Sequence, residues 1–441
     1  MNTSNGAVIA SSSSNVPDVA DLVFDDRVHS RIFTDPEIFN LEIERIFKRT
    51  WQFALHESEI PNAGDFKTFE LALEPVIAVR GKDDSIKILV NRCRHRGMQV
   101  CEQRSGNASR FQCWYHGWNY ALDGSLLSEV DQATGMTQDD LGLGQLPRVD
   151  NYRGFVFASF AESGPSLEEH LGETRRFFDI MLDYSPTGRV RVDPKVVHRV
   201  KYDGNWKQVG MDGYHVHFVH RSVVDIFSSR KEGTTGSAVG ALHMEDPWSD
   251  ASSSRARGFP YGHAALDLLE QRMAHADDYL EEVENSPGGH IYLEKMTAIH
   301  GRDKAKEMIA MHGDPHLGVF PNLQLIHDHL RVVVPISASH TEVHMYPIML
   351  EDVPAEFNTA RLRHHEDFYG PASFGSPDDA EIFERTQNGL MAEVDPWIMV
   401  NRGLGGEGEQ HESDGTTTGN ISAEVTQRAQ FAEWRRLMLQ H

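Results

Sequence analysis

The sequence predicts an α+β protein in which a small β-rich domain precedes a larger domain of helices and antiparallel strands. Short strand-like segments separated by turn residues fill residues 65–160, helical periodicity begins after residue 166, and three strand-like segments lie within 317–350. A length of 441 residues suits two or three domains. We therefore expect a disordered tail and lead-in at 1–34, the β-rich domain with a preceding helix at 35–165, and the larger domain at 166–441.

The elements of the first part follow from local patterns. Residues 1–15 are rich in Ser, Asn and Ala, which predicts disorder. Apolar residues recur at helical spacing over 35–51, with Asp35 as a plausible N-cap. We expect strands within 66–81 and 85–93, a hairpin over 111–127 with its tight turn at Asp123-Gly124, and a closing strand at 151–160.

The larger domain alternates between helical and strand patterns. A helix is expected over 167–184, strands over 190–203, a motif-bearing helix over 202–222 and a mobile Gly/Ser-rich loop over 233–257. Helical stretches follow over 266–312, with a break at 287–289, and then three strands at 317–326, 330–338 and 341–350. Helices are expected at 357–365, 378–391 and 422–439, with a Gly-rich acidic stretch at 403–419.

Composition excludes several classes of protein. A net charge of −24 disfavours nucleic acid and anionic membranes as partners. The sequence contains no run of eighteen apolar residues, and a secretory signal pattern is not apparent at the N-terminus. The three cysteines, Cys93, Cys101 and Cys113, exclude a disulfide framework, so we expect a cytoplasmic protein.

The strongest motif pairs Cys93-x-His95 with Cys113-x-x-His116, seventeen residues further on. This is the ligand set of a Rieske [2Fe–2S] centre, in which two thiolates hold one iron and two imidazoles hold the other. A structural zinc site is the alternative, but zinc modules usually pair cysteine with cysteine and histidine with histidine. Here each loop supplies one of each, followed by Gly97 or Gly117. The aromatic residues Trp114, Tyr115 and Trp118 are expected to shield the cluster from water.

A second group of metal ligands lies at residues 212–220. Non-haem iron oxygenases bind Fe(II) through two histidines and one carboxylate. His215 and His220 are five residues apart, so a local widening of the helix would be needed to bring them to one face. The carboxylate must come from elsewhere, and the best candidate is Asp379 at the start of a helix. His217 could replace either histidine, so that alternative stays open.

Together these motifs resemble the large (α) subunit of the Rieske non-haem iron aromatic ring-hydroxylating dioxygenases. The segments NWK at 205–207, DGYHVHFVH at 212–220 and GPASFGSPDD at 370–379 carry this resemblance. The C-terminal segments VNRGLGGEG at 400–408 and EVTQRAQFAEWRRLM at 424–438 resemble the branch that acts on benzoate and anthranilate. The resemblance implies a helix-grip (START-like) catalytic domain with an antiparallel sheet, and head-to-tail trimers that often include three small β subunits.

The resemblance also assigns roles to residues. It implies that Cys93, His95, Cys113 and His116 hold the cluster, that His215, His220 and Asp379 hold the mononuclear iron, and that Asp212 links the two centres between subunits. Electrons from NADH would arrive through a reductase and possibly a ferredoxin. We expect dihydroxylation of a small monocyclic aromatic, most simply an aromatic acid, with O₂ as co-substrate.

The substrate pocket is expected to draw on Val209, Met211, Phe320 and Leu325. Arg331 could pair with a substrate carboxylate, or it could be a structural or surface residue.

The chain departs from the family at one point. Only four residues separate Lys207 from Asp212, fewer than is usual, and Gln208 is the nearest substitute for an asparagine often found near the iron. Either the helix starts later and Gly210 absorbs the change, or the iron site is altered. A Rieske monooxygenase or demethylase, and an electron-carrying homologue with an impaired iron site, therefore remain alternative functions.

Overall fold

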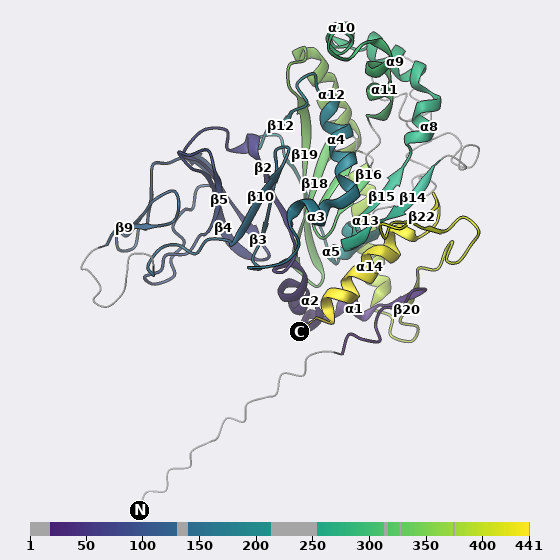
Figure 1. Cartoon of the computed structure of the whole chain (residues 1–441). Coiled ribbons are helices and arrows are strands. Elements are labelled where there is room, and N and C mark those ends of the chain that lie inside the picture. Colours follow the sequence, from purple (N-terminus) through teal and green to yellow (C-terminus); the bar gives the residue numbers. More distant parts are fainter. Residues whose placement is uncertain are drawn as a thin grey trace, which may run out of the picture.

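The computed structural model describes residues 18–129, 140–212, 254–312, 316–326, 328–373 and 375–440. A small β domain lies beside one large antiparallel sheet, which helices cover (Figure 1). The predicted α+β class is thereby confirmed. Because β3 and β19 come from the two parts, the hydrogen bond that Lys67 donates to Tyr346 (3.1 Å) ties the β domain to the large sheet.

Three small sheets build the β domain. One has the order β5-β4-β3-β6, the second β7-β8-β9 and the third β10-β11-β2. Their strands are β2 (Gln52–His56), β3 (Asp65–Leu71), β4 (Glu74–Arg80), β5 (Ile86–Val90), β6 (Ser105–Asn107), β7 (Phe111–Gln112), β8 (Asn119–Tyr120), β9 (Leu126–Ser128), β10 (Arg148–Tyr152) and β11 (Phe155–Ser159). The predicted turn at Asp123-Gly124 is present, with Gly124 at φ +84°. The single strand expected at 151–160 is instead part of a hairpin, because Arg153 and Gly154 turn the chain at positive φ.

The large sheet has ten strands in the order β12-β19-β18-β17-β16-β15-β14-β22-β21, with β13 also paired to β19. Its strands are β12 (Val190–Val192), β13 (His198–Tyr202), β14 (Arg255–Gly258), β15 (Ala264–Asp267), β16 (His316–Val319), β17 (Leu323–Ile326), β18 (His329–Ser337), β19 (His340–Leu350), β21 (Gln410–His411) and β22 (Thr417–Asn420).

Two expectations about this sheet are wrong. The segment at 317–326 forms two strands, β16 and β17, because the chain turns at Phe320–Asn322 and pairs with itself. Residues 255–257 are not loop: β14 pairs with β15 on one side and with β22 on the other. The pairing with β22 also draws part of the Gly-rich stretch at 403–419 into the sheet. Residues 233–253 of the expected loop lie outside the described residues.

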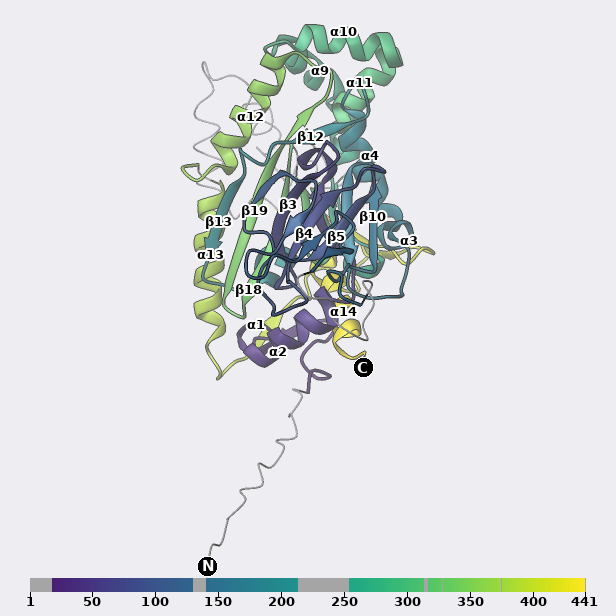
Figure 2. The same ribbon diagram turned by 90° about the vertical axis from the view of Figure 1, so that its left-hand side faces the viewer.

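Helices occupy both faces and one end of the large sheet. Helices α12 (Ala355–Tyr369) and α13 (Gly375–Leu390) run along one side of it, next to β19 and β13 (Figure 2). The others are α1 (Arg31–Thr34), α2 (Pro36–Glu42), α3 (Leu167–Leu171), α4 (Arg175–Asp183), α5 (Trp206–Asp212), α8 (Leu269–Ala274), α9 (Ala276–Asn285), α10 (Gly289–His300), α11 (Arg302–Met311) and α14 (Val425–Met438). The helix expected at 167–184 is broken, since Gly172 takes φ +48° after α3.

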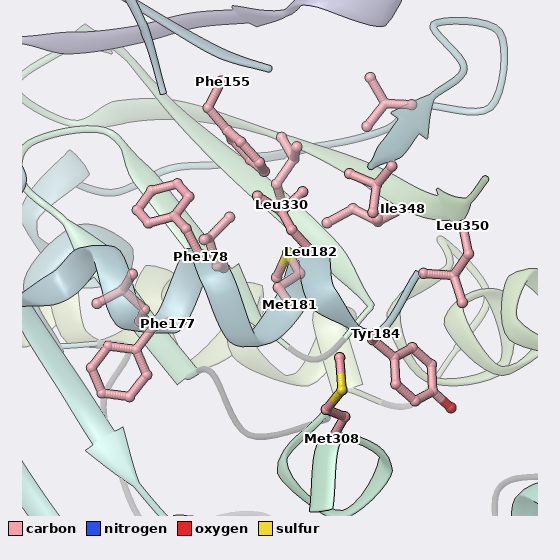
Figure 3. Close-up of a cluster of buried hydrophobic side chains, with 14 of the residues drawn as sticks. Phe155, Phe177, Phe178, Met181, Leu182, Tyr184, Met308, Leu330, Ile348 and Leu350 are labelled. Carbon is pink, nitrogen blue, oxygen red and sulfur yellow. The ribbon is translucent and has the colours of Figure 1, made fainter. Parts of the chain in front are cut away.

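The first large core joins the β domain to one face of the sheet. Phe155 comes from β11, Phe178 from α4 and Leu330 from β18, and all three are buried in this core (Figure 3). The burial of such side chains contributes on the order of 1.5–3 kcal/mol each. This core therefore fixes how the β domain sits against the sheet.

The second large core lies on the other face of the large sheet. It contains side chains from segments near both ends of the chain. Asp35 caps α2 as predicted, accepting from the backbone N–H of Glu37 at 2.8 Å. A π turn, Ile43–Phe47, continues that helix, which packs with α5 and α14. Residues 27–29 form β1, paired with β20 (Trp397–Met399), so the lead-in is ordered from residue 18. The predicted domain boundaries stay a prediction.

Glu42 is the polar centre of this second core. Its carboxylate is fully buried and accepts from Lys207 Nζ at 2.5 Å, Trp434 Nε1 at 2.6 Å and Trp206 Nε1 at 2.8 Å. A buried charge is tolerated when it is paired and hydrogen-bonded in this way. The network therefore joins α2, α5 and α14, which are remote in sequence. Among the described residues, no helix is long and apolar enough to cross a membrane.

Candidate metal centres and active site

Two loops of the β domain present the Cys/His motif with the same local geometry. In each loop the glycine N–H donates to the cysteine carbonyl at 2.9 Å, from Gly97 to Cys93 and from Gly117 to Cys113. Both glycines have positive φ, +77° and +75°, a conformation that other residues adopt only at a cost. The repeated geometry means that the two loops turn back after their histidines in the same way.

The side chains of these loops divide into an inner and an outer pair. The thiols of Cys93 and Cys113 are buried, whereas His95 is exposed and His116 half-buried. The two imidazole rings lie together, with centroids 4.5 Å apart, and His95 stacks on Trp118 at 5.1 Å. Two buried thiols and two adjacent outer imidazoles fit a cluster whose buried iron takes sulfur and whose outer iron takes nitrogen.

The expected aromatic shield is only partly correct. Trp118 is buried, but Trp114 and Tyr115 are 86% and 57% exposed. Trp114 is therefore left in water, whereas the ring of Tyr115 packs on that of His116, with centroids 3.7 Å apart, and stays mostly exposed. Large exposed aromatic side chains of this kind are typical of protein–protein contacts.

Helix α5 leads toward the predicted iron ligands. It begins at Trp206, directly after Asn205, so the interpretation that the helix starts later is wrong. The start is fixed because the buried Asn205 amide donates to the carbonyl oxygen of Ala338 at 2.8 Å. Gly210 allows close packing there, since a Cβ on it would lie 3.3 Å from the Trp206 ring.

Most of the second motif lies outside the described residues. Helix α5 is described to Asp212, but the Asp212 side chain and the residues His215, His217 and His220 are not. Gln208, the expected substitute for an asparagine, is buried and bonds to the Gln387 amide on α13 at 3.1 Å. Its side chain therefore ties α5 to the helix that carries Asp379.

Asp379 lies in the first turns of α13, with its side chain 18% exposed. Nη1 of Arg331 lies 3.8 Å from its Oδ2. Arg331 is buried, so it is not a surface residue; its Nε donates to His329 Nε2 at 3.0 Å and its guanidinium lies 5.1 Å from the Tyr369 ring centre. The structure thus places a buried cation against the carboxylate predicted to hold iron.

Three of the four predicted pocket residues share one core. Val209, Met211 and Phe320 belong to the second core, on the side of the sheet that faces α5 and α13. Leu325 belongs to the first core, on the opposite face. Successive residues of a strand point to opposite faces, so in β17 it is Ile326 that faces the second core.

The sequence interpretation missed a buried cluster of polar residues between α12 and β18. Asp328, His329 and His365 each place one potential ligand atom within 4.8 Å of the others. Burial lowers the pKa of His365 to about 4, so its imidazole is neutral at pH 7. Burial acts to raise the pKa of Asp328, but the contact with His364 outweighs it and holds the pKa below its usual range. The only signal was His and Asp beside an apolar strand, which is weak in a chain with 24 histidines.

The fold and the paired Cys/His loops define a two-domain Rieske oxygenase subunit. The chain matches the Rieske [2Fe-2S] domain over residues 50–140 and the catalytic domain of the ring-hydroxylating alpha subunit over residues 189–412. The second match covers half of the chain. The protein therefore belongs to the Rieske ring-hydroxylating oxygenases, as a large (α) subunit.

Similar proteins agree with this assignment. The large subunit of anthranilate 1,2-dioxygenase from Acinetobacter baylyi is 32% identical over 86% of this chain and 80% of its own. That of 2-halobenzoate 1,2-dioxygenase from Burkholderia cepacia is also 32% identical, with the same coverage of both chains. The solved structure of naphthalene 1,2-dioxygenase from Rhodococcus sp. has a TM-score of 0.75 at 26% identity, over 94% of each chain.

Family membership confirms the predicted class of enzyme and its cofactors. The chain is an oxidoreductase that incorporates O₂, with a Rieske [2Fe–2S] cluster and a mononuclear iron. When bound, the cluster supplies single electrons and the iron activates O₂. The chain's own contribution is to hold, separate and orient these groups.

Tyr120 provides a measurable test of the cluster site. Its hydroxyl lies 3.2 Å from Cys93 Sγ, and burial, together with Cys93, raises the pKa of Tyr120, which keeps the hydroxyl protonated as a donor. A hydrogen bond to a cluster sulfur favours the reduced, more negative state. Tyr120→Phe should therefore lower the midpoint potential by roughly 20–60 mV, for a bond worth about 0.5–1.5 kcal/mol in a one-electron couple.

Protein-film voltammetry measures this shift. Tyr152→Phe removes a hydroxyl that bonds to Asp179 on α4 (3.0 Å) from another tyrosine of the β domain, so it is the matched control and should leave the potential unchanged. An unchanged potential in Tyr120→Phe would mean that its hydroxyl does not bond to a cluster sulfur.

Proposed function

We propose that this chain is the terminal oxygenase of a multicomponent dioxygenase that dihydroxylates a monocyclic aromatic acid. NADH supplies the electrons through a reductase, and possibly a ferredoxin. The observation that carries the substrate class is the buried Arg331 guanidinium beside Asp379. The names of three relatives support it, since they are dioxygenases of anthranilate, 2-halobenzoate and toluate.

The proposal assigns the metal ligands as follows: Cys93, His95, Cys113 and His116 for the cluster, and His215, His220 and Asp379 for the iron. Asp212 would link a cluster histidine of one subunit to an iron histidine of the next. The geometry of the paired loops supports the first set. Thiolate ligands need reducing surroundings, so we also place the protein in the cytoplasm.

Charge balance at Asp379 explains why an anionic substrate would fit. The Arg331 guanidinium pairs with the Asp379 carboxylate at 3.8 Å. Once Asp379 binds Fe(II), its charge is shared with the metal, and the buried guanidinium loses part of its counter-charge. A carboxylate group on the substrate would restore the balance and place the aromatic ring near the iron.

Replacement of the arginine tests this directly. Arg331→Met keeps an unbranched apolar stem but removes the guanidinium and its charge. We expect KM for benzoate-type acids to rise about 10–100-fold, because a charge-assisted hydrogen bond is worth roughly 1.5–3 kcal/mol. The KM for the matching neutral amide should change little. Equal effects on acid and amide would indicate a structural role and would remove the support for an acidic substrate.

The overall reaction joins one aromatic ring, O₂, two electrons and two protons to give a cis-dihydrodiol. If one hydroxylated carbon carries an amino group and the other carries the carboxyl group, loss of ammonia and CO₂ from the diol gives a catechol with no further oxidant. Product analysis with ¹⁸O₂ over a panel of aromatic acids separates this from the main alternative. Two labelled oxygens in one product support the proposal, whereas one labelled oxygen, or loss of a methyl group, supports a monooxygenase or demethylase. One relative is an N-demethylase, 29% identical over 80% of this chain.

The tip of the β domain supports assembly of several copies. Five arginines there are exposed, although the whole chain carries a net charge of −24: Arg92, Arg94, Arg96, Arg104 and Arg110. Trp114 and Tyr115 of the same domain are exposed as well. A basic, aromatic tip on an acidic chain suits docking to a second copy. We propose head-to-tail trimers, with or without β subunits, in which this tip meets the next catalytic domain.

Subunit mixing tests the head-to-tail arrangement. Cys93→Ser should lack the cluster and Asp379→Ala should lack the iron, so each alone should be inactive. Co-expression should restore roughly a quarter of wild-type turnover, because one interface in four then pairs an intact cluster with an intact iron site. Mixing the two proteins without subunit exchange is the control. No recovery in verified mixed trimers would show that electrons stay within one subunit.

A further inference from the structure

The polar cluster between α12 and β18 has the composition of a metal site. Asp328 precedes β18, His329 begins it, and His365 lies on α12. All three are buried, and their ligand atoms lie within 4.8 Å of one another. The Nδ1 atom of His329 is 4.0 Å from Asp328 Oδ1. Two imidazoles and one carboxylate are a ligand set that suits Fe(II) and Zn(II).

Several polar atoms of this cluster have no hydrogen-bond partner in the described part of the chain. They are Oδ1 of Asp328, both ring nitrogens of His365, and Nδ1 of His198, whose ring stacks on that of His365 at 5.1 Å. Native proteins leave few buried polar atoms unpaired, because each loses its contact with water without compensation. A neutral imidazole with two unused nitrogens beside a carboxylate therefore points to a missing ligand.

We propose that Asp328, His329 and His365 bind one divalent transition-metal ion, of the Fe²⁺ or Zn²⁺ class, at a site separate from Asp379. Arg331 separates the two places: its Nε contacts His329 and its Nη1 lies 3.8 Å from Asp379. Its three ligands are not among the residues proposed to bind the substrate, although Arg331 contacts His329. The ligand set combines one negative charge, from the carboxylate, with two neutral imidazole nitrogens. Such a set favours a divalent cation.

The surroundings supply the outer contacts that metal ligands require. His364 Nδ1 lies 3.7 Å from Asp328 Oδ2, on the side away from the unpaired oxygen. Such contacts orient a carboxylate and fix which oxygen it offers to a metal. The backbone carbonyl of Asp328 also accepts from Ile348 N at 2.7 Å, which holds the turn in place against β19.

Arg331 limits the affinity of this site. Because its Nε donates to His329 Nε2, the ring proton of His329 lies on Nδ1, the nitrogen nearest Asp328. Metal binding through Nδ1 requires this proton to move to Nε2 and Arg331 to turn away. Metal occupancy and the Arg331–His329 hydrogen bond therefore exclude each other, and Arg331→Met should bind the metal more tightly than wild type.

Metal analysis of the full chain tests the proposal. Protein purified anaerobically and equilibrated with Fe²⁺ should carry about four metal ions per two acid-labile sulfides, two of them in the cluster. His365→Gln and Asp379→Ala should each lose one, and the double variant should lose two. His300→Gln, the same change at an exposed histidine on α10, is the control and should lose none. The visible spectrum of the cluster and the Tm show whether each variant has folded.

The possible outcomes separate this inference from the proposed function. About three metals in the wild type, or loss of the same metal in both single variants, would overturn the second site. Loss of a metal in His365→Gln but not in Asp379→Ala would instead overturn the assignment of the family iron to Asp379.

If His365→Gln does not fold, Co²⁺ titration of wild type, His329→Gln and Arg331→Met decides. We expect the Kd for Co²⁺ to be at least tenfold larger in His329→Gln than in wild type and smaller in Arg331→Met. Equal Kd values in all three proteins would overturn the proposal.

Discussion

Asp379→Ala is expected to lower kcat for aromatic-acid dihydroxylation at least 100-fold, while the cluster keeps its spectrum and potential. Loss of contacts around a metal ligand alone typically costs about 10–100-fold in activity, so loss of the ligand itself should cost more. The cluster should be unaffected because the four residues proposed to hold it all lie in the β domain, whereas Asp379 lies on α13. Stopped-flow product assays and the visible spectrum measure the two effects on the same sample.

The matched control is Glu381→Ala on the same helix. Glu381 is exposed and pairs with Arg385 at 2.7 Å, so its loss removes a surface ion pair of little energetic weight. Turnover of Glu381→Ala should stay near that of wild type. If Asp379→Ala also kept wild-type turnover, the iron ligand would have to be another carboxylate.

Glu42→Ala is expected to lower the free energy of unfolding by about 3–5 kcal/mol, because it leaves the buried Lys207 charge unpaired. It also removes the acceptor of both indole N–H groups, those of Trp206 and Trp434. Burial already lowers the pKa of Lys207 against the attraction of Glu42, so loss of that partner should lower this pKa further. Urea unfolding at pH 7, followed by tryptophan fluorescence, measures the change.

Glu44→Ala is the control for this effect. Glu44 lies two residues further along and pairs with Lys48 at 2.8 Å, but its side chain is 62% exposed. Its loss should cost less than about 1 kcal/mol. Comparable losses of stability in the two variants would mean that Glu42 acts through helix propensity rather than through the buried network.

The sequence predicted those features of the fold that are set by a few adjacent residues. The Cys/His loops, the turn at Asp123-Gly124 and the cap at Asp35 each depend on a few adjacent residues, and the structure has the expected turn and cap. Helices α12, α13 and α14 lie within a few residues of their predicted positions. The paired geometry of the Cys93 and Cys113 loops agrees with the repeated spacing of the motif.

Contacts between remote segments could not be predicted from these patterns. Strand β14 pairs locally with β15, but its second partner, β22, lies in a Gly-rich stretch more than 150 residues further on. Leu325 is apolar whichever face it takes, so the sequence could not place it in a particular core. Asp328 and His365 are brought together only when α12 packs against β19, and neither belongs to a spaced motif.

Single turnover of the pre-reduced chain tests whether it dihydroxylates an aromatic acid. The protein is reduced, freed of reductant and mixed with an aromatic acid and O₂ while the absorbance of the cluster is followed. We expect the cluster to be reoxidised only when substrate is present, and about one dihydroxylated product to form per chain, since the cluster and the ferrous iron hold one electron each. Reoxidation at the same rate without substrate, or with no product, would contradict it.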